Sequence, residues 1–149
     1  MLHFGRSRSR RGLASALIGE IAAVIDSMDG FEEVRMLEDM EFGAKEHLDE
    51  LAAFTLPKFS VYESNADRLD FFDAALQRKI AYFFTRAGGL AGHLHALAST
   101  KNESKELCSK QHAIDAQKEI NGLSELADDL LRDLRKLVSK KPMKTISRA

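Results

Sequence analysis

Cysteine and proline are both scarce in this chain of 149 residues. The single cysteine, Cys108, allows no intrachain disulfide, which fits a reducing compartment. The two prolines, Pro57 and Pro142, leave long stretches free to be helical. No segment has the roughly 20 consecutive apolar residues that a membrane-spanning helix needs, because Glu20 interrupts the most apolar run, 12–25. We therefore expect a soluble protein that lies in the cytoplasm or at the inner face of the membrane.

The overall composition is typical of a globular or coiled-coil-rich protein, with 44% hydrophobic and 30% charged residues. The length suits one domain with a core of its own. A net charge of −1 creates no global field that would attract nucleic acid. The composition thus indicates one domain and argues against a general nucleic-acid binder.

The charge is nevertheless unevenly distributed, since the stretch 20–73 is acidic and both ends are basic. The bases of the two ends are Arg6, Arg8, Arg10 and Arg11, and Lys136, Lys140, Lys141, Lys144 and Arg148. The first 19 residues contain no acid, so an organellar presequence is a second interpretation of this stretch. We expect a flexible basic arm over 1–10, a helical bundle domain over 11–139 and a disordered basic tail over 140–149.

Four stretches carry apolar residues at helical spacing, each forming one stripe. The stripes comprise Ala14, Leu17, Ile18, Ile21, Val24, Ile25 and Met28; Val34, Leu37, Met40, Ala44, Leu48 and Leu51; Leu76, Ile80, Phe83, Ala87, Leu90, Leu94 and Leu97; and Ala113, Ala116, Ile120, Leu123, Ala127, Leu130, Leu134 and Leu137. Spacings of three and four residues in the last two stripes are typical of coiled coils. We predict an all-α fold with four main helices, the last two forming a long antiparallel coiled-coil-like hairpin.

Capping residues set the expected helix ends. Asp29-Gly30 ends the first helix, and Pro57 ends the second, which begins near Phe31. Asp73 caps the third helix, and a capping box from Thr100 to Glu103 begins the fourth.

The connection 58–72 does not follow helical periodicity. Phe59, Val61 and Tyr62 favour β structure and predict an extended piece. The run Ser64-Asn65-Ala66-Asp67 predicts a capping box that begins a short helical turn through Leu69. We expect this connection to close one end of the bundle.

The segment Val61-Tyr-Glu-Ser-Asn-Ala-Asp-Arg-Leu69, followed by Phe71-Phe72, resembles a group of small uncharacterised bacterial helical proteins. Those proteins carry a VYEANADRLGLL-like segment between two long helices, and many begin with a membrane anchor. This chain has Asp70 where glycine is usual, and no hydrophobic anchor precedes its arginine cluster. The resemblance implies a helical fold and a bacterial origin, and it carries no reaction.

Two patterns could suggest a ligand. Gly88, Gly89 and Gly92 lie inside a helical pattern rather than after a strand, so a close approach of a neighbouring helix or a kink explains them better than a phosphate loop. His93, Cys108 and His112 could meet across the hairpin as three metal ligands. No closely spaced ligand motif supports that site, so we expect no metal and no other cofactor.

The function predicted from these features is that of a non-enzymatic helical interaction or scaffold protein. No Glu-x-x-His pair of a di-iron bundle and no serine nucleophile elbow occurs in the sequence. The alternative is a regulatory module that binds an anionic membrane surface or nucleic acid through its basic termini. Nucleic acid is disfavoured because no aromatics are interleaved with the arginines.

We expect a protein partner, and a homo-oligomer stays open. The candidate interaction residues are Arg6, Arg8, Arg10, Arg11, Tyr62, Asn65, Asp67 and Arg68. If consecutive helices are antiparallel, both termini and the connection 57–72 lie at one end of the bundle. That end would form a basic pole, composed of Arg6, Arg8, Arg10, Arg11, Lys58, Arg68, Lys140, Lys141 and Lys144.

Overall fold

The computed structural model of this chain describes residues 2–29, 52–99 and 106–139, with the backbone alone for 2–9, 97–99 and 106–113. Its elements are α1 (Leu2–Asp29), the short α4 (Ser60–Ser64), the 3₁₀ helix η2 (Ala66–Phe71), α5 (Ala74–Ser99) and α6 (Glu106–Ser139). No strand occurs within these ranges, so the all-α prediction is confirmed for the part described.

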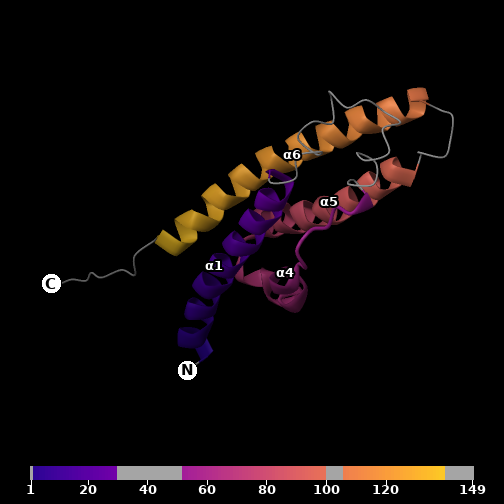
Figure 1. Cartoon of the computed structure of the whole chain (residues 1–149). Helices are drawn as coiled ribbons and strands as arrows, with labels where there is room; N and C mark the ends of the chain where they lie inside the picture. Colours follow the sequence, from indigo (N-terminus) through magenta and orange to yellow (C-terminus); the bar gives the residue numbers. More distant parts are fainter. Residues whose placement is uncertain (1, 30–51, 100–105, 140–149) are drawn as a thin grey trace.

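Two long helices, α1 and α5, both pack along α6, while α4 packs on α1 and η2 lies against the start of α5 (Figure 1). Lys79 of α5 pairs with Asp129 of α6, whereas Arg86, further along α5, pairs with the earlier Glu119. This reversed order makes α5 and α6 antiparallel. The second predicted helix, over 31–54, and the Thr100 capping box lie outside the described residues, apart from 52–54.

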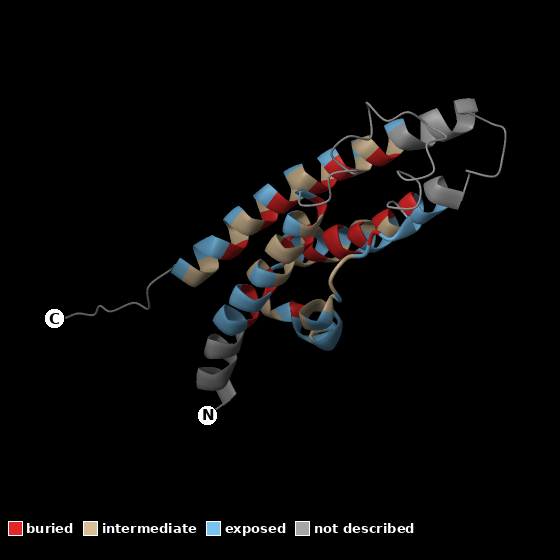
Figure 2. Cartoon of the chain, in the orientation of Figure 1, coloured by how far each residue is buried: buried red, intermediate tan, exposed pale blue. Residues whose placement is uncertain are grey.

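The apolar stripes of the three long helices form one core, and their polar faces are exposed (Figure 2). The fully buried side chains include Leu17, Ile21, Ile80, Phe83, Leu90, Leu94 and Leu123. Burying each such side chain contributes roughly 1.5–3 kcal/mol. The stripes therefore identified most of this core, but they missed the buried Leu13, Phe54, Leu69, Phe72 and Phe84, and their Ile18, Ile25 and Leu137 are only partly buried.

The first helix is longer than expected. It begins at Leu2, so the segment expected to be a flexible arm is helical. The predicted stop at Gly30 lies outside the described residues. Arginine is a good helix former and no proline occurs before Pro57, so nothing in the sequence breaks the helix here. None of the described helices is long and apolar enough to cross a membrane.

The connection before α5 differs from the extended piece that was predicted, since Val61 and Tyr62 lie in α4. Their backbone N–H groups donate to the two carboxylate oxygens of Glu20 in α1, at 2.9 and 2.8 Å. The first N–H groups of a helix have no partner within it, so this carboxylate supplies the missing acceptors. A tertiary contact has overridden the local β preference.

The predicted capping box at Ser64 is also wrong, because the side chain of Asn65 makes no N-cap hydrogen bond to η2. Its Nδ2 instead donates to the carbonyl of Val61 at 2.8 Å, closing the end of α4. The short helical turn through the buried Leu69 is confirmed as η2. The predicted cap at Asp73 is confirmed, since its Oδ1 accepts the N–H of Leu76 at 2.8 Å.

Candidate interaction site

An open groove of about 660 Å³ lies at the end of the molecule where α1 begins and α6 ends, and we call it the terminal groove. Four elements form it, and its lining residues are Arg10, Asp70, Phe71, Phe72, Asp73, Ala75, Leu76, Lys79, Asp133, Lys136 and Leu137. Phe72 and Leu76 belong to the buried core, while Phe71 and Leu137 are half-buried. The groove therefore combines an apolar base with charged walls.

Part of the charge in the terminal groove holds the helices together. The ammonium of Lys79 lies 2.7 Å from a carboxylate oxygen of Asp129 and 3.1 Å from one of Asp133. The hydrogen bonds that Lys79 donates, the one to Asp129 first, raise the pKa of Lys79. The bond from Lys79 likewise lowers the pKa of the Asp129 carboxyl. This cluster ties α5 to α6 beside the groove.

The remaining charges of the groove are exposed on its rim. Arg10 comes from α1, Lys136 from the last turns of α6, and Asp70 from η2. Arg10 and Lys136 are 126 positions apart, so packing of α1 on α6 brings them to one groove. The rim thus presents cations on the side of the long helices and a carboxylate on the side of η2.

A second, smaller groove of about 270 Å³ adjoins the first, because Phe71 lines both. Gly12, Leu13 and Ala16 of α1 form one wall, and Asn65, Arg68 and Phe71 form the other. Three of the predicted interaction residues, Arg10, Asn65 and Arg68, therefore gather around the two grooves.

The other predicted interaction residues are not among the residues that line the two grooves. Tyr62 is half-buried and stacks on Phe84 of α5, with ring centroids 4.5 Å apart and planes at 14°. Arg11 and Asp67 are exposed on α1 and η2. The side chains of Arg6 and Arg8 are not described, although their backbone belongs to α1.

No family model, curated protein or solved structure matches this chain. The resemblance around Val61–Leu69 therefore stays a prediction. The functional argument depends on the geometry of this chain alone.

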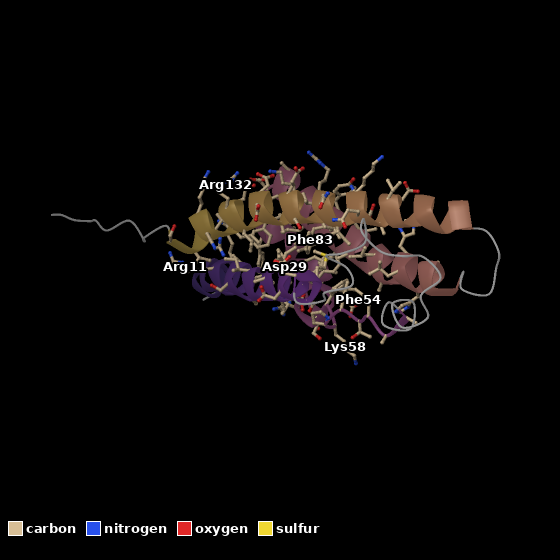
Figure 3. The ribbon with its side chains drawn as sticks, turned by 45° about the horizontal axis from the view of Figure 1, so that its top comes forward. Arg11, Asp29, Phe54, Lys58, Phe83 and Arg132 are labelled. Atoms are coloured by element: carbon tan, nitrogen blue, oxygen red, sulfur yellow. The ribbon has the colours of Figure 1, made fainter. Side chains whose placement is uncertain are left out.

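The predicted basic pole is described only in part, because Lys140, Lys141, Lys144 and the side chains of Arg6 and Arg8 lie outside the described residues. The start of α1 and the end of α6 do lie at one end (Figures 1 and 3). Lys58 lies away from Arg11 (Figure 3), and the ring of its neighbour Phe59 packs on Phe84 of α5, with centroids 5.1 Å apart. Asp70, Asp73 and Asp133 also line the groove, so its described part carries both signs of charge.

Sequence reasoning missed two polar contacts that position the helices. Arg86 donates through Nε and Nη2 to the two carboxylate oxygens of Glu119, at 3.1 and 2.9 Å. Its Nη1 donates to the hydroxyl of Tyr82 at 2.6 Å. The bond to Glu119, followed by that to Tyr82, raises the pKa of Arg86. The second missed contact is Glu20, whose only signal was its position inside an apolar run.

The two patterns that could suggest a ligand have different outcomes. A Cβ at Gly88 would lie at an ordinary contact distance of 3.8 Å from Cε2 of Phe59, and one at Gly89 or Gly92 would meet no described atom within 4 Å, so no close approach of a neighbouring helix is observed at these glycines. His93 is exposed on α5, while the side chains of Cys108 and His112 are not described, so the three-ligand metal site is untested. No metal-binding group of three side chains occurs within the described residues.

Proposed function

We propose that this chain is a non-enzymatic interaction protein that binds another protein through the terminal groove. The observation that supports this function is the groove itself, where an apolar base lies between walls of both charges. Such a surface suits a polypeptide segment, since apolar side chains can fill the base while charged ones pair along the rim. The volume of about 660 Å³ could accommodate a few side chains.

The charge layout suggests what the bound segment carries. Arg10 and Lys136 would attract carboxylates toward α1 and α6, whereas Asp70 would attract a base toward η2. A segment with an apolar centre, acids on one side and a base on the other would match all three. The rim charges would then fix the direction of binding more than its strength.

Several polar groups of the chain support a scaffold more than a catalyst. Glu20 caps α4, Lys79 joins two carboxylates of α6, and Arg86 holds Glu119. Each of these charges stabilises the position of one helix against another. The chain would then serve as a scaffold that carries the groove at its end.

We also propose a second long helix, a coiled-coil-like hairpin and a cellular location for this protein. Residues 31–52 would form a second long helix, because their apolar stripe needs a partner, and this completes four main helices; Ala53 and Phe54 are not helical, so the predicted end at Phe54 is two residues too late. The spacing of the α5 and α6 stripes supports a coiled-coil-like hairpin. We place the protein in the bacterial cytoplasm, with a peripheral position at the inner face of the membrane as the alternative.

A pair of neighbouring alanines allows a sharp test. Ala75 is exposed and lines the groove, whereas Ala74 is exposed and does not. Tryptophan at position 75 would fill the groove, while tryptophan at position 74 adds the same side chain outside it. Affinity capture with the full chain should recover a protein that Ala75→Trp loses and Ala74→Trp keeps. Equal recovery by both variants would contradict binding in the groove.

A further inference from the structure

The two basic ends of the chain meet at one edge of the molecule. Arg10 near the start of α1 lines the same groove as Lys136 and Leu137 near the end of α6. In both orientations the N-terminal end of α1 and the C-terminal end of α6 lie on the same side (Figures 1 and 3). We call this side, formed by α1 up to Arg11 and α6 from Leu134, the terminal edge.

The sequence gives this edge a charge unlike that of the rest of the molecule. Residues 2–11 and 134–139, which form the described part of this edge, carry six of the 22 basic residues and none of the 23 acidic residues. All 23 acids belong to residues 20–133, which carry only 12 bases and are therefore strongly acidic. A negatively charged surface would attract the terminal edge and repel the body.

The helical backbone concentrates the N-terminal part of this charge. Arg6, Arg8, Arg10 and Arg11 all belong to α1. At 1.5 Å per residue they span about 8 Å of helix axis. That span is about one Debye length at physiological ionic strength, so a charged surface would experience the four bases together.

Apolar residues accompany the bases at both ends. Leu2 and Phe4 precede the arginines, and Met143 and Ile146 lie among the bases that follow α6. Bases combined with apolar side chains are typical of segments that lie in the interfacial region of an anionic membrane. A nucleic-acid surface would instead call for aromatics interleaved with the bases, and Phe4 is the only aromatic in these two segments.

We propose that the terminal edge docks on an anionic lipid surface and fixes the orientation of the molecule there. The hairpin end of α5 and α6 would point into solution. The terminal groove would lie beside the membrane, where a membrane-associated partner could reach it.

The first test compares two variants with the same change in charge. Arg6→Ser with Arg8→Ser removes two bases of the edge without touching the groove. Lys58→Ser with Lys118→Ser removes two exposed bases far from it. In co-sedimentation with phosphatidylcholine vesicles containing phosphatidylserine, the first variant should bind about thirtyfold more weakly than the unmodified chain at low salt. The second should bind within about twofold of it.

Loss of binding at high salt, and on vesicles of phosphatidylcholine alone, is also expected. No binding to the anionic vesicles at low salt, or equal weakening by the two variants, would overturn the proposal. Tighter binding to a short DNA duplex than to the vesicles at the same salt would overturn it in favour of a nucleic-acid surface. Arg6→Ser with Arg8→Ser should leave protein capture unchanged, since neither residue is among those that line the groove, so failure of lipid docking is distinguishable from failure of the groove.

The second test measures orientation. In a Cys108→Ser background, a polarity-sensitive fluorophore is attached to Ser139→Cys at the end of α6 or to Asn121→Cys in its middle; both positions are exposed. Anionic vesicles should shift the emission of the first probe to shorter wavelength and leave the second unchanged. Equal shifts at both positions, or a shift at position 121 alone, would overturn docking through the terminal edge.

Discussion

The carboxylate of Glu20, in the second half of α1, accepts the backbone N–H of Tyr62 at 2.8 Å across a separation of 42 residues. Its other oxygen accepts the neighbouring N–H of Val61. One side chain therefore both begins α4 and attaches it to α1. Through the stacking of Tyr62 on Phe84, the same contact connects α1 to α5.

Removing this carboxylate should destabilise the whole bundle. Glu20→Ala leaves two helix N-terminal donors of α4 without their acceptor, and the free energy of unfolding should fall by about 1–2 kcal/mol. Chemical denaturation monitored by circular dichroism measures the change. Glu125→Ala, on the exposed face of α6, is the control and should change stability by less than about 0.5 kcal/mol. Equal effects would show that the cap contributes nothing.

The ion pair between Arg86 and Glu119 should show a measurable coupling energy. The pair is bidentate, and its side chains are only 31% and 24% exposed, so a double-mutant cycle with alanine should give about 1 kcal/mol. Arg86→Lys should recover less than half of it, because an ammonium cannot form both bonds in this geometry. Arg132 and Asp129, 3.6 Å apart with Arg132 65% exposed, are the comparison pair and should couple by about 0–0.3 kcal/mol. Similar coupling energies for the two pairs would show that the bidentate geometry of Arg86 and Glu119 adds no stability.

The contact of Lys79 with Asp129 should make stability depend on pH in two windows. Lys79 lowers the pKa of Asp129 below its ordinary 3.8, so this contribution is complete above that value and is lost as the pH falls below it. Asp129 and Asp133 raise the pKa of Lys79 above its ordinary 10.5, so its contribution is complete below that value and is lost as the pH rises above it.

Urea denaturation of the unmodified chain and of Lys79→Met across this pH range measures the effect. The difference in stability between the two should be constant between about pH 5 and 9 and should shrink toward both extremes. A difference that is independent of pH would show that the ion cluster does not contribute.

A charge placed in the core should prevent folding. Leu90 is fully buried in the α5 stripe, and Leu90→Asp would bury an unpaired carboxylate at a cost of several kcal/mol. Far-ultraviolet circular dichroism should show a large loss of helix. Thr85→Asp, exposed on the same helix, should keep a helical spectrum. A folded Leu90→Asp variant would contradict the assignment of this stripe to the core.

Alanine at the α5 glycines should stabilise the protein. A Cβ at Gly88 would lie at an ordinary contact distance of 3.8 Å from Phe59, and one at Gly89 would meet no described atom within 4 Å. Both substitutions improve helix propensity, so each should raise the free energy of unfolding by about 0.5–1 kcal/mol. Thermal denaturation shows whether each substitution raises or lowers the stability. Destabilisation by Gly88→Ala would mean that the approach of Phe59 requires glycine.

The long helices and their buried faces could be predicted from the sequence, because both depend on the periodicity of apolar residues. Stripes such as Leu76 to Leu94 repeat with the period of a helix, so they identify both the helix and its buried face. The cap at Asp73 depends on residues next to one another in the chain. Local preferences are sufficient for such features.

The connection between helices and the candidate site depended on tertiary structure. Val61 and Tyr62 prefer extended backbone, and only Glu20, brought into place by the packing of α1, supplies the acceptors that make them helical. The terminal groove combines Arg10 with Lys136, which share no local pattern. Sequence periodicity determines which face of each helix is buried, because burial follows from the order of apolar residues. Which polar groups meet depends on how the helices pack, because those contacts join residues far apart in the chain.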